Sequence, residues 1–224
     1  MVLRGAVLAW CIWGERNQMV FRGNLSSHHI ILARVHRLVE EQGSYVARIY
    51  PNAAAKPVTS PNKWSSPPPG MVKINADASL EVDGWVGIGV IARNSDGDVL
   101  FSASRRIRAY WTPEIAEAKA IAVAVRLGKH FGFKEVIFES DCQVVINRLS
   151  SNAIFLSDLD SILHEILSSS TFFSYVAWSH VKRDGNCVAH HLAKLVPFGV
   201  EQIWENHTPM DVAPYVLMDF LSRN

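Results

Sequence analysis

The part of the chain that most limits its fold begins at Met71, where strand-like segments follow one another with no helix between them. In VKINADAS (72–79) apolar and polar residues alternate, as in a strand whose successive side chains point to opposite faces. WVGIGVIARNSDGDVLFSASRRI (85–107) then predicts two further strands around the turn residues Asn94–Gly97, a strong hairpin signal. These patterns predict an antiparallel meander.

Helical and strand patterns alternate after the meander. Thr112 suits an N-cap and Pro113 the first position of an alanine-rich helix. The pattern then predicts a strand, two helices, a strand and a last helix, at 134–140, 141–151, 156–169, 171–181 and 187–194. The order β-β-β-α-β-α-α-β-α predicts an α/β fold, with a five-stranded mixed sheet flanked by helices.

Four zones follow from these patterns. Residues 1–50 carry two helix-like segments (8–21 and 28–42) and form an N-terminal helical extension. Residues 51–70 are rich in proline, serine and alanine, which indicates an extended linker. We expect the α/β domain at 71–200 and a less regular C-terminal tail at 201–224.

Composition narrows the possible partners and the compartment. A net charge of +1 gives no overall attraction to nucleic acid, so such a partner needs a local basic patch. Three widely spaced cysteines favour a reducing compartment. No run is long enough to span a bilayer, and GAVLAWCIWG (5–14) lacks a cleavage site for a signal peptide. We therefore expect an intracellular protein with no membrane partner, in either nucleus or cytoplasm; the oligomeric state is not predicted.

Three acids stand in unusual places. Asp77 is near the end of an apolar strand, Glu117 is on the apolar face of its helix, and Asp141 directly follows a strand. Each has an ordinary alternative: Asp77 as a solvent-facing strand residue, Glu117 in a structural ion pair, Asp141 as a helix cap. Together they offer oxygen ligands from separate elements, which hard divalent cations require. No glycine-rich phosphate loop, GxSxG motif or CxxC pair accompanies them.

Two adjacent histidines lie in the helical stretch CVAHHLAK (187–194). Neighbours on a helix are about 100° apart, so His190 and His191 cannot easily bind one metal ion. His191 borders the apolar stripe and is expected to pack, whereas His190 lies on the polar side with Asn186 and Lys194.

Four segments carry a resemblance to a known family. KINADAS (73–79), PEIAEAKAIAVAV (113–125), EVIFESDCQVVI (135–146) and HVKRDGNCVAHHLAK (180–194) resemble the ordered motifs of type 1 ribonuclease H. They look most like the plant ribonuclease H-like domains derived from retrotransposon reverse transcriptases. The resemblance covers about residues 70–197 and implies a ribonuclease H-like fold.

The resemblance also implies a chemistry. Asp77, Glu117 and Asp141 would hold two Mg²⁺ or Mn²⁺ ions on the scissile phosphate of the RNA strand in an RNA–DNA hybrid. The family's proton-shuttling histidine falls on His180. Its fourth acid falls on His190, which makes His190 a candidate metal ligand better suited to Mn²⁺ than to Mg²⁺. The glycine that usually follows the first aspartate is Ala78.

Other residues near these motifs are candidates for contact with nucleic acid. Asn186, Lys182 and Arg183 follow the last strand, beside the predicted site, and are expected to bind substrate. The basic group Arg105, Arg106 and Arg108 is equally consistent with a solvated rim. Tyr110, Trp111 and Trp178 are candidates for stacking on bases, with Trp178 favoured as a core residue.

Three functional hypotheses result. The leading one is a nucleic-acid-binding, metal-dependent endoribonuclease that cuts RNA–DNA hybrids. The second, suggested by His190 and Ala78, is a domesticated module that binds nucleic acid with weak or no catalysis. The third is a retroelement fragment that has lost its activity.

Overall fold

The computed structural model describes residues 60–151, 157–195 and 200–221, and near the N-terminus residues 9, 11–13, 15–17, 19–20, 23 and 30–31. The chain divides into two compact units, Met1–Pro57 and Val58–Asn224. In the first unit, residues 11–13, 15–17, 19–20 and 30–31 are helical. The other residues of the two predicted N-terminal helices, and residues 51–59 of the predicted linker, lie outside the described residues.

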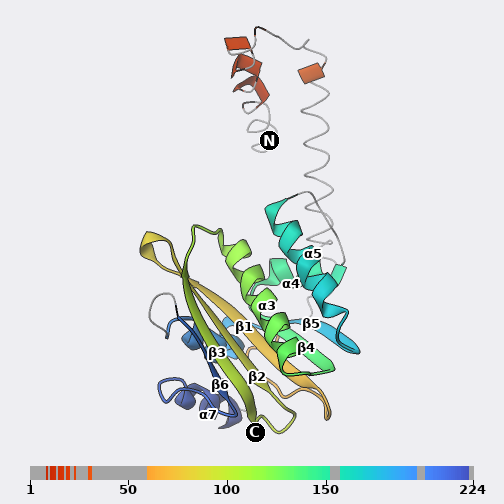
Figure 1. The fold of residues 1–224 in the computed structure, drawn as a ribbon, viewed down its shortest axis with the longest axis vertical. Helices are drawn as coiled ribbons and strands as arrows, with labels where there is room; N and C mark the ends of the chain where they lie inside the picture. The colour runs from red at the N-terminus through yellow and green to blue at the C-terminus, as the bar shows by residue number, and fades with distance from the viewer. Residues whose placement is uncertain are drawn as a thin grey trace. The chain divides into compact units, whose positions relative to one another are not determined.

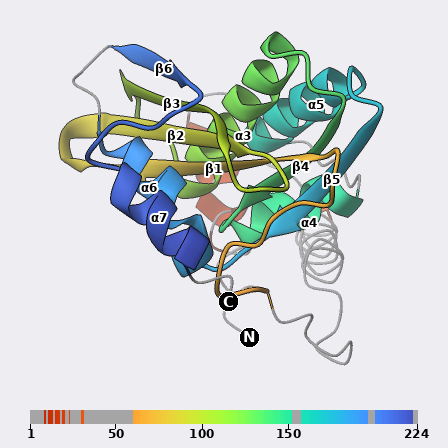
Figure 2. The same ribbon diagram turned by 90° about the horizontal axis from the view of Figure 1, so that it is seen from below.

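The second unit is built on a mixed sheet in the order β5-β4-β1-β2-β3-β6. The strands are β1 (Val72–Leu80), β2 (Trp85–Arg93), β3 (Val99–Arg108), β4 (Glu135–Ser140), β5 (Tyr175–His180) and β6 (Glu201–Glu205). The helices are α3 (Pro113–His130), α4 (Gln143–Ser151), α5 (Asp158–Ser170), α6 (Cys187–Ala193) and α7 (Ala213–Leu221), with short 3-10 turns η1 (Val82–Gly84) and η2 (Arg183–Asn186). Figure 1 shows the helices packed against the sheet, and Figure 2 shows α3 and α5 on one face with α6 and α7 on the other.

The predicted meander is confirmed. β1 pairs with β2, and β2 with β3, both antiparallel, and β4 adds to β1 in parallel, with β5 in parallel beyond it. Gly97 closes the β2–β3 hairpin with a positive φ of 87°, which glycine adopts without strain. The Asn94 side chain accepts a hydrogen bond from the Asp98 amide and fixes the same turn.

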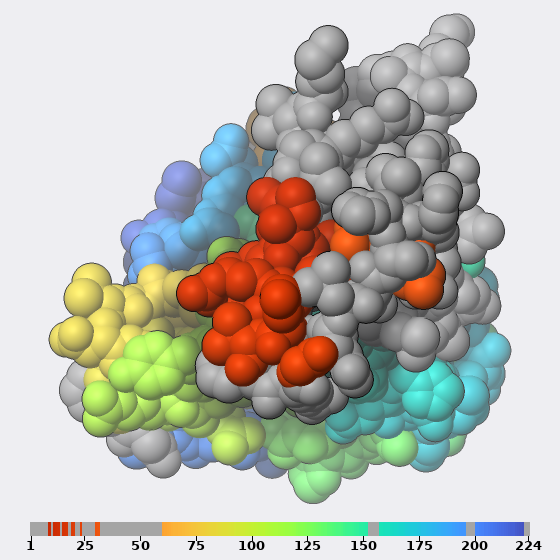
Figure 3. Space-filling model, turned by 90° about the horizontal axis from the view of Figure 1, so that it is seen from above, coloured from red at the N-terminus to blue at the C-terminus, as the bar shows by residue number. Residues whose placement is uncertain are grey.

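Helix α3 covers the first face of the sheet because its buried side is made of small residues. Pro113 occupies the first turn, as predicted, and four alanines are fully buried: Ala116, Ala118, Ala120 and Ala124. Small side chains bring the helix axis close to the strands. Helix α5 packs beside α3. A buried ion pair between Arg148 and Asp160 joins α4 to α5. In Figure 3, atoms of α5 (cyan) and of the β2–β3 side (yellow to green) lie on opposite sides of the described surface.

Helix α6 approaches the second face unusually closely, and two glycines in β2 make this possible. A Cβ at Gly87 would lie 1.7 Å from the carbonyl oxygen of Ala193, and one at Gly89 would lie 2.0 Å from that of Ala189. The close approach of α6 to β2 therefore requires glycine at both positions. Because α6 carries His190, this contact also sets the height of His190 above the sheet.

The C-terminal region is more regular than predicted. Residues Glu201–Glu205 form β6, which pairs antiparallel with β3, so the sheet has six strands and the predicted number of five is wrong. Helix α7 follows, and its Asp219 forms a buried ion pair with Arg93 of β2 at 2.8 Å. Across the described segments, no helix combines the length and apolar character needed to cross a membrane.

The contact between β2 and α6 gives a stability prediction. Gly89→Ala places a methyl group inside the backbone of α6, so we expect the free energy of unfolding to fall by about 3 kcal/mol. Urea unfolding followed by circular dichroism measures the change. Gly132→Ala is the control, because nothing lies within 4 Å of its Cβ. Gly132→Ala should lower the free energy of unfolding by only about 1 kcal/mol, because alanine is strained at the positive φ of this position. Equal losses in the two variants would contradict the packing argument.

Candidate metal centre

Three carboxylates from three different elements converge at one end of the central strand. Asp77 comes from β1, Glu117 from α3, and Asp141 from the turn that follows β4. Each offers an oxygen, and the three ligand atoms lie within 4.8 Å of one another. The arrangement follows from the topology: β1 and β4 are parallel neighbours, so their ends meet at the same edge, and α3 crosses above them. The three acids predicted from the sequence are thus brought together.

The solvent-facing alternative for Asp77 is wrong, and the other two acids make specific contacts beside it. Asp77 is fully buried, not solvent-facing. Asp141 accepts hydrogen bonds from Arg183 at 2.9 Å and from Asn186 at 3.5 Å. Glu117 accepts a long hydrogen bond, 3.4 Å, from the Ser140 hydroxyl. Their carboxylates face one another at the sheet edge.

One carboxylate oxygen is left without a donor. Asp77 Oδ1 is buried and accepts no hydrogen bond from any of the described residues; its nearest cationic atom is a guanidinium nitrogen of Arg183, 3.5 Å away. A buried oxygen that lacks a hydrogen bond is costly unless another charge meets it. This oxygen, with the two facing acids, forms a donor set that suits a hard divalent cation.

Mutual repulsion changes the protonation of the acids. Burial, followed by the charges of Asp77 and Asp141, raises the pKa of Glu117 to about 9. Burial also raises the pKa of Asp77 against the lowering effect of the His190 hydrogen bond, and the charge of Asp141 raises it further. Without a cation, Glu117 therefore holds a proton at neutral pH.

Arg183 supplies a positive charge beside the acids. It lies in η2, directly after β5, and one guanidinium nitrogen is 2.9 Å from Asp141 and 3.5 Å from Asp77. Its side chain is 55% exposed, so the guanidinium reaches the acids from the solvent side. The predicted placement of Arg183 beside the site agrees with this geometry, and its contact with the acids themselves was not foreseen.

His190 stands on the same side as Arg183. Its Nδ1 lies 2.9 Å from Asp77 Oδ2, and because a carboxylate only accepts, the Nδ1–H must donate. One guanidinium nitrogen of Arg183 lies 2.8 Å from this Nδ1 and 3.1 Å from Nε2. Because Nδ1 carries its hydrogen towards Asp77, only Nε2 can accept from the guanidinium. The cluster of converging ligand atoms among the described residues does not include His190, and its role as a metal ligand stays a prediction. His191 packs, as expected: its ring stacks on Tyr215 of α7 with centroids 3.6 Å apart.

Asn186 belongs to a buried amide network beneath the acids. Its side-chain nitrogen donates to the Ala76 carbonyl at 2.9 Å, and its oxygen accepts from Asn75 at 3.2 Å. Asn75 in turn donates to Glu139 of β4 at 3.0 Å. Asn186 is 1% exposed, so it orients the backbone and Asp141; its predicted contact with substrate stays a prediction. The sequence reasoning missed Asn75, although a polar residue two positions before Asp77 on the same strand face was a usable signal.

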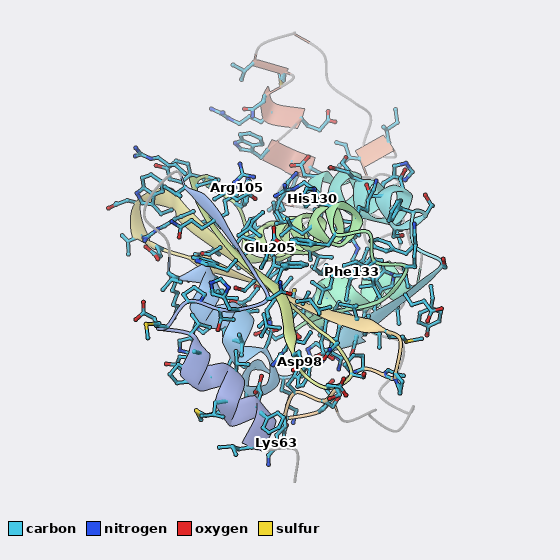
Figure 4. All side chains as sticks on the ribbon, turned by 60° about the horizontal axis from the view of Figure 1, so that its bottom comes forward. Lys63, Asp98, Arg105, His130, Phe133 and Glu205 are labelled. Carbon is cyan, nitrogen blue, oxygen red and sulfur yellow. The ribbon has the colours of Figure 1, made fainter. Side chains whose placement is uncertain are left out.

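The remaining candidates are more scattered. His180 ends β5, and its Nε2 is 3.1 Å from the Asp141 carbonyl. Lys182 is exposed in the following loop. Of the basic group on β3, Arg106 pairs with Glu81 and Arg108 lies over the Trp85 ring, 5.9 Å from its centroid. Figure 4 shows Arg105 at the opposite end of the view from Lys63.

The aromatic candidates differ in exposure. Tyr110 is 80% exposed, which leaves its ring available to a partner. Trp178 stacks on Phe138 with centroids 5.2 Å apart, as expected for a core residue. Trp111 packs against the edge of the core.

Comparison with solved structures identifies the fold. RNase H1 from the halophilic archaeon Halobacterium salinarum NRC-1 is 24% identical over 55% of this chain and 95% of its own, with a TM-score of 0.52. The N-terminal RNase H domain of a Mycobacterium tuberculosis protein is 23% identical over 55% of this chain and 91% of its own, with a TM-score of 0.51. LC11-RNase H1, crystallised in complex with an RNA/DNA hybrid, is 21% identical over 55% of this chain and 94% of its own, with a TM-score of 0.51. At such identities the likeness shows the fold alone: the ribonuclease H-like fold expected from the motifs is confirmed.

Comparison of the sequence with known families agrees with the fold. A search of curated proteins gives no match. The family described as "Reverse transcriptase-like" matches residues 75–196, more than half of the chain, and the matched region includes all three acids. The chain therefore belongs to the reverse transcriptase-like family, whose matched region here has the ribonuclease H-like fold.

Proposed function

We propose that this protein is a metal-dependent endoribonuclease that hydrolyses the RNA strand of RNA–DNA hybrids. The observation that carries the proposal is the convergence of the Asp77, Glu117 and Asp141 ligand atoms within 4.8 Å, around a buried Asp77 oxygen that accepts no hydrogen bond from the described residues. The RNA/DNA hybrid bound to LC11-RNase H1 supports the substrate class.

The residues at this site suit Mg²⁺ or Mn²⁺. Asp77, Glu117 and Asp141 would hold the ions, two of them in the proposed reaction, with His190 beside Asp77 as a further ligand that favours Mn²⁺. When bound, such ions activate a water molecule and stabilise the leaving 3′-oxygen of the RNA strand. Glu117 would give up its proton when a cation binds, because the ionised carboxylate is the ligand.

The other side chains have separate tasks. Asn186 keeps Asp141 in place through its long hydrogen bond to that carboxylate. His180, at the end of β5 beside Asp141, takes up or delivers a proton at its imidazole. Lys182 and Arg183 bind phosphates of the nucleic acid, which neutralises charge next to the acids.

A hollow beside the acids is suited to a nucleic acid strand. It has a volume of about 600 Å³ and is lined by the end of β1, by Glu81, which pairs with Arg106, and by Arg183, His190 and Lys194. Basic side chains on one wall of a solvent-open hollow favour a phosphate backbone. A strand in this hollow would meet Arg183 and His190, which both contact Asp77.

A second function, binding without cleavage, is favoured by the contacts of Arg183 and His190. Both occupy the solvent side of Asp77, and each makes a polar contact with it (3.5 and 2.9 Å). If these contacts persist in solution, they compete with a cation for the same oxygens. The protein would then bind hybrids through its basic loop, with strong salt dependence and no turnover.

The first prediction concerns cleavage. In Mg²⁺ and in Mn²⁺, the purified chain should cut the RNA strand of an end-labelled hybrid, and Asp77→Asn should reduce the rate by roughly a hundredfold or more, because it removes a ligand oxygen charge. Gel analysis of the labelled products measures both rates. Asp211→Asn is the control, because Asp211 is exposed and outside the acid cluster. Salt-sensitive binding without any cleavage would favour the second function.

The second prediction concerns pH. Because the pKa of Glu117 is about 9 and a cation binds the ionised carboxylate, Mn²⁺ binding at neutral pH should release a proton. The apparent affinity should rise roughly tenfold per pH unit and level off near that pKa. Calorimetric titration in two buffers of different ionisation enthalpy counts the protons released.

The same raised pKa has a consequence for the metal-free protein. The folded state holds the Glu117 proton more tightly than the unfolded state, so the free energy of unfolding should fall as pH rises from 4.5 towards 9. Glu117→Gln is the control for both measurements and should flatten both pH dependences. An affinity for Mn²⁺ that does not change with pH would contradict the argument.

The third prediction concerns Arg183. Arg183→Ala removes the guanidinium that faces Asp77 and Asp141, so the protein should bind Mn²⁺ more tightly, by roughly tenfold, while it binds hybrid more weakly. Calorimetry measures the first effect and fluorescence anisotropy the second. Lys182→Ala, in the same loop but exposed away from the acids, should weaken hybrid binding only. Unchanged Mn²⁺ affinity in Arg183→Ala would show that the guanidinium does not compete.

A further inference from the structure

Residues 60–65, SPNKWS, lie inside the stretch predicted as a linker and yet contact the candidate site. They precede β1 and belong to the second compact unit. We call them the strap. Figure 4 labels Lys63 of the strap at the lower end of the view, away from Arg105 and His130.

The strap is anchored by a buried tryptophan. Trp64 is 2% exposed, and its Nε1–H donates to Asn75 Oδ1 at 3.0 Å. The guanidinium of Arg93 lies over its ring, 3.6 Å from the centroid. A desolvated contact between a guanidinium and an aromatic ring is stronger than an exposed one. The strap is therefore fixed to β1 and β2.

The other side of the strap packs against the loop that follows β5. The amide of Lys182 donates to the Pro61 carbonyl at 3.0 Å. Gly185 lies so close that a Cβ there would be 3.0 Å from the carbonyl carbon of Lys63 and 3.1 Å from the nitrogen of Trp64. The loop that carries Arg183 is thus held against the strap by backbone contacts.

The strap also reaches His180. Ser60 Oγ is 2.6 Å from His180 Nδ1, and His180 Nε2 is 3.1 Å from the carbonyl oxygen of Asp141. Because a carbonyl only accepts, Nε2 must carry the hydrogen, and Nδ1 of the neutral ring then accepts from the Ser60 hydroxyl. Both ring nitrogens are engaged, which fixes the tautomer and the ring plane.

We propose that Ser60 is a positioning residue for His180. Ser60 holds the imidazole as the Nε2–H tautomer, with Nε2 beside Asp141, and Trp64 supplies the anchor that keeps Ser60 in reach. The catalytic consequence rests on the proposed function; the effect on the ring does not.

The test compares Ser60→Ala with Ser60→Thr in the full chain. Long-range ¹H–¹⁵N spectra of the histidine rings should show His180 as one Nε2–H tautomer in the wild type and as a mixture in Ser60→Ala. The threonine variant, which keeps the hydroxyl, should restore the wild-type spectrum. On hybrid, kcat of the alanine variant should fall roughly tenfold with KM unchanged, because His180 acts in the chemical step and does not hold the substrate.

Ser65→Ala is the matched control. Ser65 lies in the same strap, but its hydroxyl accepts from Lys73 at 3.3 Å, so neither the His180 spectrum nor kcat should change. Should Ser60→Ala fail to fold, Ser60→Cys replaces it, because a thiol is a weak donor. An unchanged His180 tautomer in the alanine variant, or a threonine variant that behaves like alanine, overturns the inference. If the wild type cuts no hybrid, the proposed function fails while the spectra still decide the role of Ser60.

Discussion

The repulsion among three carboxylates in a largely buried space is the constraint on which the rest of the site depends. Burial of Asp77 beside Glu117 and Asp141 is unfavourable unless positive charge or protons balance it. The chain uses both means: Glu117 keeps a proton, with its pKa raised to about 9, and the Arg183 guanidinium lies 2.9 Å from Asp141. A divalent cation would replace both at once. The affinity for metal is therefore set by the cost of removing one proton and one guanidinium, and not by the carboxylates alone.

The polar face of β1 shows how the fold supports this constraint. Lys73, Asn75 and Asp77 all point to the side covered by α6, and all three are buried. Lys73 pairs with Glu139 at 3.1 Å, and Asn75 links Trp64, Glu139 and Asn186. Beyond them, Arg93 pairs with Asp219 of α7. Such networks are most stable where every member has its partners, and Asp77 Oδ1 is a member that accepts no hydrogen bond from the described residues. The C-terminal helix and the strap thus contribute to the geometry of Asp77 through chains of hydrogen bonds.

The sequence predicts the elements well wherever a local pattern encodes them. The meander, the start of α3 at Pro113 and the three acids all follow from periodicity and position. β6 was missed because EQIWE is a short, mostly polar edge strand without clear alternation, and its identity depends on pairing with β3. The composition of the strap is that of a linker, because its fold depends on one residue, Trp64. The partners of Trp64, Asn75 and Arg93, are 11 and 29 positions away along the chain. The sequence of β1 alternates between apolar and polar residues, as in a strand with one face in solvent. The burial of its polar face depends on packing against α6, which the local pattern does not reveal.

The predicted replacement of an acid by His190 can be examined against the contacts that His190 makes. A fourth carboxylate beside Asp77 would add repulsion that only another cation could balance. The imidazole instead donates to Asp77 Oδ2 and lies beside Arg183, so that it satisfies a carboxylate oxygen without adding negative charge. The guanidinium is held in this position because His190 and Asp141 both accept hydrogen bonds from it. Arg183 and His190 are therefore coupled, because the imidazole favours the position in which the guanidinium shields the acids.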